Sequence, residues 1–330
     1  MHRCLQLAQK GLGHVSPNPM VGCVVVHNDQ IIAEGYHKIY GGAHAEVEAI
    51  RAVTDADVLK ASTVYVSLEP CAHHGKTPPC ADLLISKQVM SVVAGMTDPN
   101  PLVAGNGLKK LKAAGIDVIC GVLESECRKV NKRFIVNQVK QRPYVILKWA
   151  ESADGYMGGD QIKQISGLAA KTRLHKWRSE EDAFLVGTET LIQDNPQLNT
   201  RLWKGRDPVR VAIDRTLRSE GLPLNFYRKG QKSILINGIK NGHTGDLEYV
   251  KTDSTEPEAI LKALHERRIG SVVVEGGFHL LNSFLEAGLF DEIRVFRSKH
   301  LILNGGIKAP RIDFNSVSQE DLLDDTLFIY

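Results

Sequence analysis

The stretch that decides the fold of this chain is SLEPCAHHGKTPPC, residues 67–80. A shorter stretch upstream, His44-Ala45-Glu46, has to be read with it. Together they supply one histidine, two cysteines and a carboxylate. A catalytic zinc site keeps three protein ligands, drawn from Cys sulfur and His nitrogen, and leaves one position open. We therefore predict that His44, Cys71 and Cys80 bind Zn²⁺ and that a water fills the fourth position.

Glu46 has the position of a catalytic acid and base. A carboxylate beside an activated water can take its proton and pass it to a leaving group, as in the H-x-E…P-C arrangement of zinc-dependent nucleobase deaminases. Side chains two apart do not share a helix face, so His44 and Glu46 can serve one metal only at a helix start. Gly41-Gly42 indicates such a start. A second helix start, after Pro70, would favour a thiolate at Cys71.

The insert between the two cysteines, Ala72 to Pro79, departs from that signature, which has only two residues there. Within it, Gly75, Lys76 and Thr77 offer backbone N–H groups, a cation and a hydroxyl, which are the groups that bind a phosphate. We expect Lys76 and Thr77 to bind substrate beside the metal. The loop therefore indicates a phosphorylated small molecule and not a base in a polynucleotide.

The same residues resemble those of a known family, the bifunctional deaminase–reductase of riboflavin biosynthesis. The resemblance rests on His44-Ala45-Glu46-Val47 and on the segment 69–80, which includes His73. It implies that Asn18 contacts the pyrimidine and that His37 and His73 lie in the substrate pocket. From the residues alone, Asn18 reads as a turn residue that stabilises its own backbone, and His37 as a histidine at a strand end.

Composition indicates an ordinary globular protein of two domains. The chain has 330 residues, a formal net charge of +3 and 24% charged residues. So mild a charge does not indicate nucleic-acid binding, no apolar run reaches transmembrane length, and the cysteines do not form a disulfide framework. The amino terminus shows no signal-peptide pattern. We expect a cytoplasmic enzyme that binds neither nucleic acid nor membrane, and the resemblance suggests a homo-oligomer.

The first 140 residues alternate strands and helices after an opening hairpin. This pattern predicts an α/β sandwich with a mixed sheet, and the resemblance makes it a cytidine-deaminase-like α/β/α domain. The turn-rich stretch Asp98-Pro99-Asn100-Pro101 with Ala104-Gly105-Asn106-Gly107 reads as a plain loop for most of its residues, although it also matches the family pattern. We expect helices near 2–11, 44–54, 81–87, 106–114 and 124–139, and strands at 21–26, 31–36, 63–67, 89–95 and 116–120.

Gln141-Arg142-Pro143 indicates a boundary between two domains, which we place at 1–140 and 144–330. The second half alternates again but has no G-x-G-x-x-G motif. It resembles the dihydrofolate-reductase-like half of the same family, which implies an α/β domain that uses NADPH. We expect strands at 144–149, 183–186, 209–213, 233–236, 271–274 and 292–296, and helices at 168–180, 257–267 and 279–287.

The resemblance implies a cofactor side and a substrate side in this half. Val274-Glu275-Gly276-Gly277 ends a strand and opens a helix, so its N–H groups can approach a pyrophosphate. Taken singly, each motif also reads as a turn or a solvated charge, and Tyr156 and Gly167 depart from the family pattern. The residues implied for the cofactor are Gly187, Thr190, Glu275, Gly276 and Gly277; those implied for the substrate are Lys148, Ser166, Arg178, Asp194, Leu198 and Arg201.

The resemblance implies two reactions in series. The first is zinc-dependent hydrolytic deamination of 2,5-diamino-6-ribosylamino-4(3H)-pyrimidinone 5′-phosphate. The second is NADPH-dependent reduction of its ribosyl group to ribityl, which gives 5-amino-6-(5-phosphoribitylamino)uracil. Two alternatives stay open: a zinc deaminase of another nucleobase or nucleotide fused to a non-reductase domain, and a non-catalytic protein whose zinc is closed by His73 or His74.

Overall fold

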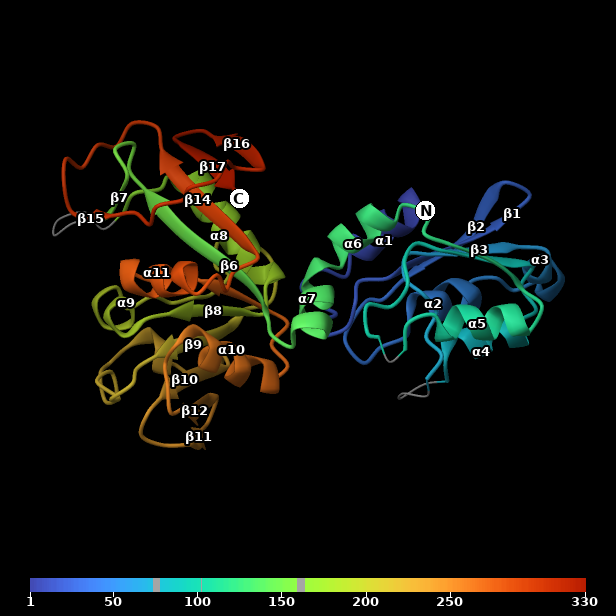
Figure 1. Ribbon diagram of the computed structural model, residues 1–330, viewed down its shortest axis with the longest axis horizontal. Coiled ribbons are helices and arrows are strands. Elements are labelled where there is room, and N and C mark those ends of the chain that lie inside the picture. Colours follow the sequence, from blue (N-terminus) through green and yellow to red (C-terminus); the bar gives the residue numbers. More distant parts are fainter. Residues whose placement is uncertain (74–77, 102, 159–163) are drawn as a thin grey trace. The chain divides into compact units, whose positions relative to one another are not determined.

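The computed structural model describes residues 1–73, 78–101, 103–158 and 164–330. The chain divides into two compact units, Met1–Gln141 and Arg142–Tyr330. Each unit consists of a sheet with helices packed against it (Figure 1), which confirms the expected α/β class. Among the described residues, no helix is both long enough and apolar enough to span a bilayer.

The described strands of the first unit form one mixed sheet, in the order β2-β1-β3-β4-β5. The opening hairpin is antiparallel and β1 also runs antiparallel to β3, whereas β3, β4 and β5 are parallel. Parallel strands bring their carboxyl ends to one edge, and the segment that carries Cys71 follows β3 there. The strands are β1 (Gly22–His27), β2 (Gln30–Tyr36), β3 (Thr63–Val66), β4 (Ser91–Ala94) and β5 (Asp117–Cys120).

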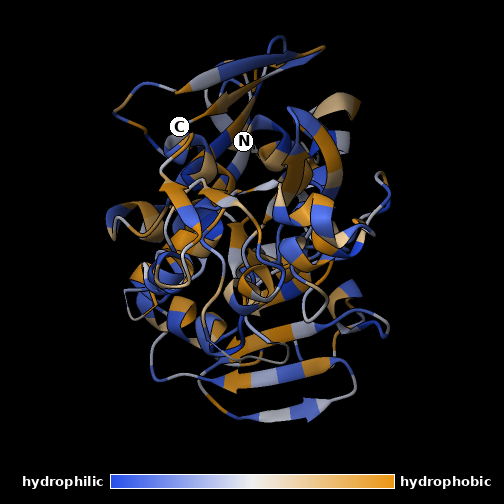
Figure 2. Cartoon of the chain, turned by 90° about the vertical axis from the view of Figure 1, so that its right-hand side faces the viewer, coloured by the Kyte–Doolittle hydropathy of each residue, from blue (hydrophilic) through white to orange (hydrophobic). Residues whose placement is uncertain are grey.

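Amphipathic helices cover this sheet, and single helices carry both orange and blue residues in Figure 2. The predicted helix at 124–139 is interrupted at Asn131, whose backbone is not helical (φ −97°, ψ 17°). Its side chain binds the Met20 backbone instead, with N···O distances of 2.8 and 3.0 Å. The helices are α1 (His2–Gln9), α2 (Ala45–Arg51), α3 (Ala56–Lys60), α4 (Cys80–Ser86), α5 (Asn106–Ala113), α6 (Glu124–Val130) and α7 (Lys132–Lys140).

In the described part of the second unit, ten strands form one sheet in the order β11-β12-β10-β9-β8-β13-β6-β14-β17-β16. Seven of them, β12 to β14 in that order, are parallel. The strands are β6 (Tyr144–Glu151), β8 (Ala183–Val186), β9 (Val209–Ile213), β10 (Ser233–Asn237), β11 (Gly242–Thr244), β12 (Leu247–Lys251), β13 (Ser271–Val274), β14 (Glu292–Ser298), β16 (Ser318–Leu322) and β17 (Asp325–Ile329); β7 (Tyr156–Gly158) and β15 (Ile307–Lys308) pair separately.

The helices expected in this unit are all present. The sequence did not predict the short helix α9, nor the strands β7, β11, β12 and β15–β17. Most residues of the outer strands β11 and β16 are exposed. An exposed edge strand buries little surface, so its sequence need not alternate apolar and polar residues and is hard to predict. The helices are α8 (Leu168–Glu180), α9 (Thr188–Gln193), α10 (Pro257–Glu266) and α11 (Phe278–Glu286), with a 3₁₀ turn at Asn225–Tyr227.

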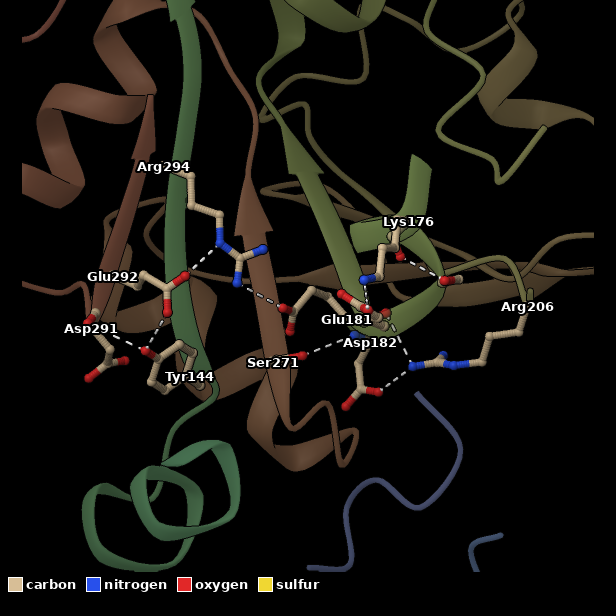
Figure 3. Close-up of polar contacts among 11 residues, drawn as sticks. Tyr144, Lys176, Glu181, Asp182, Arg206, Ser271, Asp291, Glu292 and Arg294 are labelled. Atoms are coloured by element: carbon tan, nitrogen blue, oxygen red, sulfur yellow. Dashed lines mark hydrogen bonds and ion pairs between the residues drawn. The ribbon is translucent and has the colours of Figure 1, made fainter. Parts of the chain in front are cut away.

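A network of buried charges lies at the amino ends of the parallel strands (Figure 3). The Arg294 guanidinium donates to Glu292 at 2.6 Å and to Glu181 at 3.2 Å. It also lies over the ring of Trp177, 4.4 Å from its centroid. Each buried carboxylate therefore has a cationic partner, as burial of charge requires. We regard this network as structural, because ligands of parallel sheets bind at the opposite, carboxyl edge.

Candidate active sites

His44, Cys71 and Cys80 come together at the carboxyl edge of the first sheet. His44 precedes α2 in an extended conformation, and Cys80 is the first residue of α4. Their ligand atoms all lie within 4.8 Å of one another, with His44 Nδ1 3.6 Å from Cys71 Sγ and 3.3 Å from Cys80 Sγ. Tetrahedral Zn²⁺ places such atoms about 3.5–3.8 Å apart. The donor set and its geometry fit zinc.

The expectation of a helix start after Pro70 is wrong. Among the described residues of that loop, none before Cys80 is helical. The Cys71 thiolate is stabilised differently, since the backbone N–H of Cys80 donates to Cys71 Sγ at 3.2 Å. Hydrogen bonds from the Cys80 and His44 side chains lower the pKa of the Cys71 thiol to about 4. The proton shared with Cys71 raises the pKa of Cys80.

Glu46 lies in the first turn of α2, with only 3% of its surface exposed. The helix reaches this position because β2 has a glycine beneath it. A Cβ on Gly35 would lie 2.4 Å from the carbonyl oxygen of Ala45. Burial, followed by the nearby Cys71, raises the pKa of Glu46 to about 7. A carboxyl group with such a pKa can both accept and return a proton near neutral pH.

A pocket of about 350 Å³ opens beside these residues. Asn18 and His37 line it and contact each other, with Asn18 Nδ2 3.1 Å from His37 Nε2. His37 Nδ1 lies 2.9 Å from the carbonyl oxygen of Ala43. A carbonyl only accepts, so Nδ1 carries the proton and Nε2 accepts from the Asn18 amide. Burial lowers the pKa of His37, which favours this neutral form. Because the Asn18 amide nitrogen faces His37, Asn18 Oδ1 can accept a hydrogen bond from a ligand.

The remaining residues expected in this pocket divide into two groups. His73 lines the pocket, as the family resemblance implied. Lys76 and Thr77 lie outside the described residues. Asp98 and Asn100, whose stretch reads as a loop but matches the family pattern, also line it. Their signal was position: they follow β4, which is parallel to β3, so both strands end at one edge.

In the second unit, Lys148, Arg178 and Glu275 form a buried cluster. Lys148 Nζ donates to Glu275 Oε1 at 2.8 Å, and Arg178 Nη2 donates to Glu275 Oε2 at 3.2 Å. Burial opposes ionisation of Glu275, but the two cations hold its pKa down to about 2. The solvated reading of Lys148 and Arg178 is therefore wrong. The Glu275 side chain lies with the residues expected on the substrate side, although its backbone belongs to the glycine segment expected on the cofactor side.

The glycine segments of this unit converge at one edge of its sheet. Gly187 follows β8 and precedes α9, while Gly277 precedes α11 after the neighbouring parallel strand β13. A Cβ on Gly277 would lie 3.8 Å from Thr190 Oγ1. A Cβ on Gly276 would lie 2.8 Å from the Leu280 side chain. The five residues expected on the cofactor side, Gly187, Thr190, Glu275, Gly276 and Gly277, thus come from two neighbouring strand ends.

Asp194, Leu198 and Arg201 belong to the segment after α9. Asp194 ends that helix, and burial raises its pKa. Leu198 is buried, and Arg201 Nη1 donates to Asn199 Oδ1 at 3.0 Å. Burial and then the neighbouring Arg178 lower the pKa of Arg201. Arg201 therefore lies close enough to Arg178, a member of the cluster with Lys148 and Glu275, for the two positive charges to repel each other.

Ser166 is partly buried immediately before α8, and the two departures from the family pattern lie nearby in sequence. The Gly167 N–H donates to Asp325 Oδ2 at 2.8 Å. A Cβ on Gly167 would lie 2.9 Å from Asp324 Oδ2, the end of a side chain that can move away, so this contact does not by itself require a glycine. Tyr156 begins β7, and nothing in the structure explains its presence there.

Fold and site together define a two-unit enzyme: a zinc-type nucleobase deaminase unit joined to a second α/β unit with a ligand-binding carboxyl edge. Residues 1–96 match the cytidine and deoxycytidylate deaminase zinc-binding region, and residues 143–312 match the RibD C-terminal domain. The chain belongs to the RibD family of riboflavin biosynthesis proteins.

Relatives of this family resemble the chain over almost its full length. Riboflavin biosynthesis protein RibD of Aquifex aeolicus is 37% identical over 97% of this chain and 91% of its own length. That of Actinobacillus pleuropneumoniae is 36% identical, over 94% and 85%. Among solved structures, the Thermotoga maritima diaminohydroxyphosphoribosylaminopyrimidine deaminase/5-amino-6-(5-phosphoribosylamino)uracil reductase is 38% identical, with a TM-score of 0.92 and 100% and 96% coverage. Acinetobacter baumannii RibD is 33% identical, with a TM-score of 0.90 and 99% and 96% coverage.

Proposed function

We propose that this chain carries out both reactions implied by the sequence, in series. Residues 1–140 deaminate 2,5-diamino-6-ribosylamino-4(3H)-pyrimidinone 5′-phosphate, and residues 144–330 reduce the ribosyl group of the product with NADPH. The observation that carries the proposal is the pocket in which Glu46 lies beside the His44, Cys71 and Cys80 ligand atoms. This pocket occurs in one chain with a RibD C-terminal domain, which supports the second reaction, the reduction of the ribosyl group.

In the first reaction, His44, Cys71 and Cys80 bind Zn²⁺, which supplies a Lewis acid that makes water nucleophilic at neutral pH. Glu46 accepts a proton from the attacking water. It delivers that proton to the pyrimidine ring nitrogen. It then takes the second proton from the hydroxyl on the attacked carbon and passes it to the amine, which leaves as ammonia when the C–N bond breaks. Burial keeps Glu46 near the protonation midpoint that both transfers need.

The pocket walls orient the substrate for this transfer. Asn18 Oδ1 accepts from an N–H of the pyrimidine, since its Nδ2 is already occupied by His37. His73 lies in the same pocket, and we propose that Lys76 and Thr77 bind the phosphate. The closed zinc site of a structural protein is disfavoured, because a buried carboxylate beside the ligands has no purpose there.

In the second reaction, NADPH lies across Gly187, Thr190, Gly276 and Gly277, with Glu275 at the end of β13. Glycines at two neighbouring strand ends let the backbone approach a pyrophosphate closely. When bound there, NADPH would supply the hydride for the sugar carbon attached to nitrogen in the open-chain imine, whose nitrogen gains a proton.

Cationic side chains hold the substrate in that unit. Lys148 and Arg178 bind the single carboxylate of Glu275, and Arg201 lies close enough to Arg178 for the two charges to interact. The excess of positive charge suits a phosphate group. Ser166, Asp194 and Leu198 complete the proposed substrate side.

A two-channel assay tests both reactions in the intact chain. Ammonia release and NADPH oxidation are followed together after addition of the diaminopyrimidinone ribosyl phosphate. Ammonia should appear first and NADPH loss second, and a chelator should suppress both. With pre-deaminated substrate, NADPH oxidation should survive the chelator. Ammonia release without NADPH loss would refute the reductase assignment, and turnover of cytidine instead would favour the other deaminase reading.

We propose further that the protein acts in the cytoplasm, on this small molecule and on neither nucleic acid nor membrane, and that it forms a homo-oligomer. Fractionation of cells followed by the two-channel assay should place the activity in the cytosolic fraction. Sedimentation equilibrium should give a mass above the 36.4 kDa of one chain.

A further inference from the structure

Glu69 makes more backbone contacts than a loop carboxylate ordinarily does. It follows β3, and only 6% of its surface is exposed. Its Oε2 accepts from the backbone N–H of Asp98 at 3.1 Å and of Gly105 at 2.8 Å. Its Oε1 accepts from the N–H of Gly107 at 2.8 Å and of Leu108 at 3.4 Å. Hydrogen bonds to an ionised acceptor are about twice as strong as neutral ones.

Two of these bonds cap helix α5 from a distant part of the chain. The helix begins at Asn106, and Gly105 before it has no side chain to cap it and a φ of 77°. The N–H groups of Gly107 and Leu108 lie in the first turn, where no intrahelical partner exists. The carboxylate supplies that partner and also suits the positive end of the helix dipole.

The close approach depends on a glycine. A Cβ on Gly107 would lie 1.9 Å from the carbonyl oxygen of Pro70. Only glycine therefore allows the stretch that runs from Glu69 to Cys71 to lie against the start of α5. The metal ligand Cys71 is two residues from the carboxylate that makes this contact.

The other two bonds fix a wall of the substrate pocket. Asp98, Asn100 and Val103 line the pocket. Glu69 binds the backbone at Asp98, where this wall begins, and at Gly105, just after it ends. Within the wall, Asp98 Oδ1 accepts from the Asn100 N–H at 2.8 Å. One carboxylate thus holds both ends of the wall.

We propose that Glu69 is a positioning residue for substrate: it fixes the wall that carries Asp98, Asn100 and Val103 relative to the metal ligand Cys71. The wall presents carboxylate and amide oxygens, which accept hydrogen bonds from the N–H or O–H groups of a ligand. Glu69 itself touches no reacting atom and acts through this wall. The inference rests on the proposed deaminase reaction of the first unit.

The test is Glu69→Gln in the full chain loaded with zinc. The amide keeps the shape but turns an NH₂ donor towards backbone donors, so about half of the four bonds are lost. We expect KM for deamination to rise about 10-fold or more, with kcat changed far less. Hydrogen exchange should quicken about 10-fold at the amides of residues 105, 107 and 108, and stay unchanged in β1 and α2. Zinc content should stay at one per chain.

Two comparisons separate positioning from general damage. Asp82→Asn makes the same chemical change in an acid that pairs with Lys110 on the surface of α4 and α5, and it should alter neither KM nor exchange. Reduction of pre-deaminated substrate by Glu69→Gln should match the wild type. An unchanged KM in a folded, zinc-loaded Glu69→Gln would overturn the proposal, as would faster exchange without any change in KM.

A more conservative substitution tests the proposal if Glu69→Gln does not fold correctly. If Glu69→Gln fails to retain zinc, Glu69→Asp keeps the charge on a shorter side chain and should retain zinc with an intermediate KM. Loss of zinc in both variants would make Glu69 a structural residue and refute its role towards substrate. Wild-type chain that releases no ammonia would refute the proposed function instead, which is a distinct result.

Discussion

Lys148 Nζ lies 2.8 Å from Glu275 Oε1, and both side chains are almost entirely buried. The pair joins β6 to the end of β13, two parallel neighbours in the sheet. Arg178 binds the other oxygen of the same carboxylate. A buried ion pair contributes little net stability over an apolar pair, but removal of one partner leaves an uncompensated charge. The cluster therefore makes the second unit sensitive to any change at Glu275.

Glu275→Gln should make the stability of the second unit less dependent on pH. The pKa of Glu275 is lowered from 4.5 to about 2 in the folded protein. A lowered carboxyl pKa contributes stability that is present above the unfolded value and is lost as the pH falls from about 4.5 to about 2. A shift of this size corresponds to about 3 kcal/mol.

Urea unfolding of wild type and Glu275→Gln from pH 7 to pH 2 measures this effect. The difference in the free energy of unfolding should be about 3 kcal/mol at pH 7 and vanish near pH 2. Glu320→Gln removes an exposed acid paired with Arg173 and should cost less than about 1 kcal/mol. A constant difference between wild type and Glu275→Gln across this range would contradict the cited pKa.

Gly277→Ala should weaken NADPH binding without damage to the fold. Among the described residues, a Cβ there would meet only Thr190 Oγ1, at 3.8 Å, which is ordinary van der Waals contact. The methyl group would instead occupy the space through which a pyrophosphate approaches the backbone. We expect an unchanged melting temperature and a Kd for NADPH raised about 10-fold, as a clash in a binding site costs 1–3 kcal/mol.

Titration calorimetry with NADPH and thermal melting measure the two quantities separately. Gly158→Ala is the control and should leave both unchanged, since no atom of the described residues lies within 4 Å of the added Cβ. An unaltered Kd in Gly277→Ala would place the cofactor elsewhere in the second unit.

Elements with a strong apolar period or a β-branched run were predictable from the sequence. The strands at 183–186, 209–213 and 271–274 have the predicted bounds. The helix at 168–180 also has them, although its apolar residues show almost no helical period. Helix α9 could not be found, because Thr188–Gln193 is too short to show a helical period and only Leu191 of it is buried. Strand β16 reads SQEDL, with only Leu322 buried, and pairs with β17 at the sheet edge without an alternating apolar pattern.

The candidate sites were predictable to the extent that one motif held the chemistry. His44, Glu46, Cys71 and Cys80 were read from two stretches, and their ligand atoms do converge. From the residues alone the pocket wall at Asp98 reads as a loop, since its place depends on the pairing of β3 with β4 and on Glu69, 29 positions upstream of Asp98. Such long-range contacts leave no periodic signal in the sequence.

Gly35→Ala should loosen the metal site through the backbone. The added Cβ would lie 2.4 Å from the carbonyl oxygen of Ala45 and 2.5 Å from the N of Ala49, so α2 must move off β2. Overpacking of this kind costs about 1–3 kcal/mol. Because His44 precedes α2, its displacement should raise the Kd for zinc, measured by competition with a chromogenic chelator. NADPH oxidation with pre-deaminated substrate should be unchanged, and zinc affinity equal to wild type would show that α2 need not lie so close.

Glu46→Gln should retain zinc and lose deamination. The amide has nearly the shape of the carboxyl group and is not a metal ligand here, so one zinc per chain should remain. It cannot accept a proton, and removal of a general base lowers kcat about 10²–10⁴-fold. Glu48→Gln is the matched control, two residues along the same helix, where the carboxylate pairs with Lys38 on the surface; its ammonia release should equal that of the wild type. Retained turnover in zinc-loaded Glu46→Gln would remove Glu46 from the proton path, whereas loss of zinc would make it part of the metal site instead.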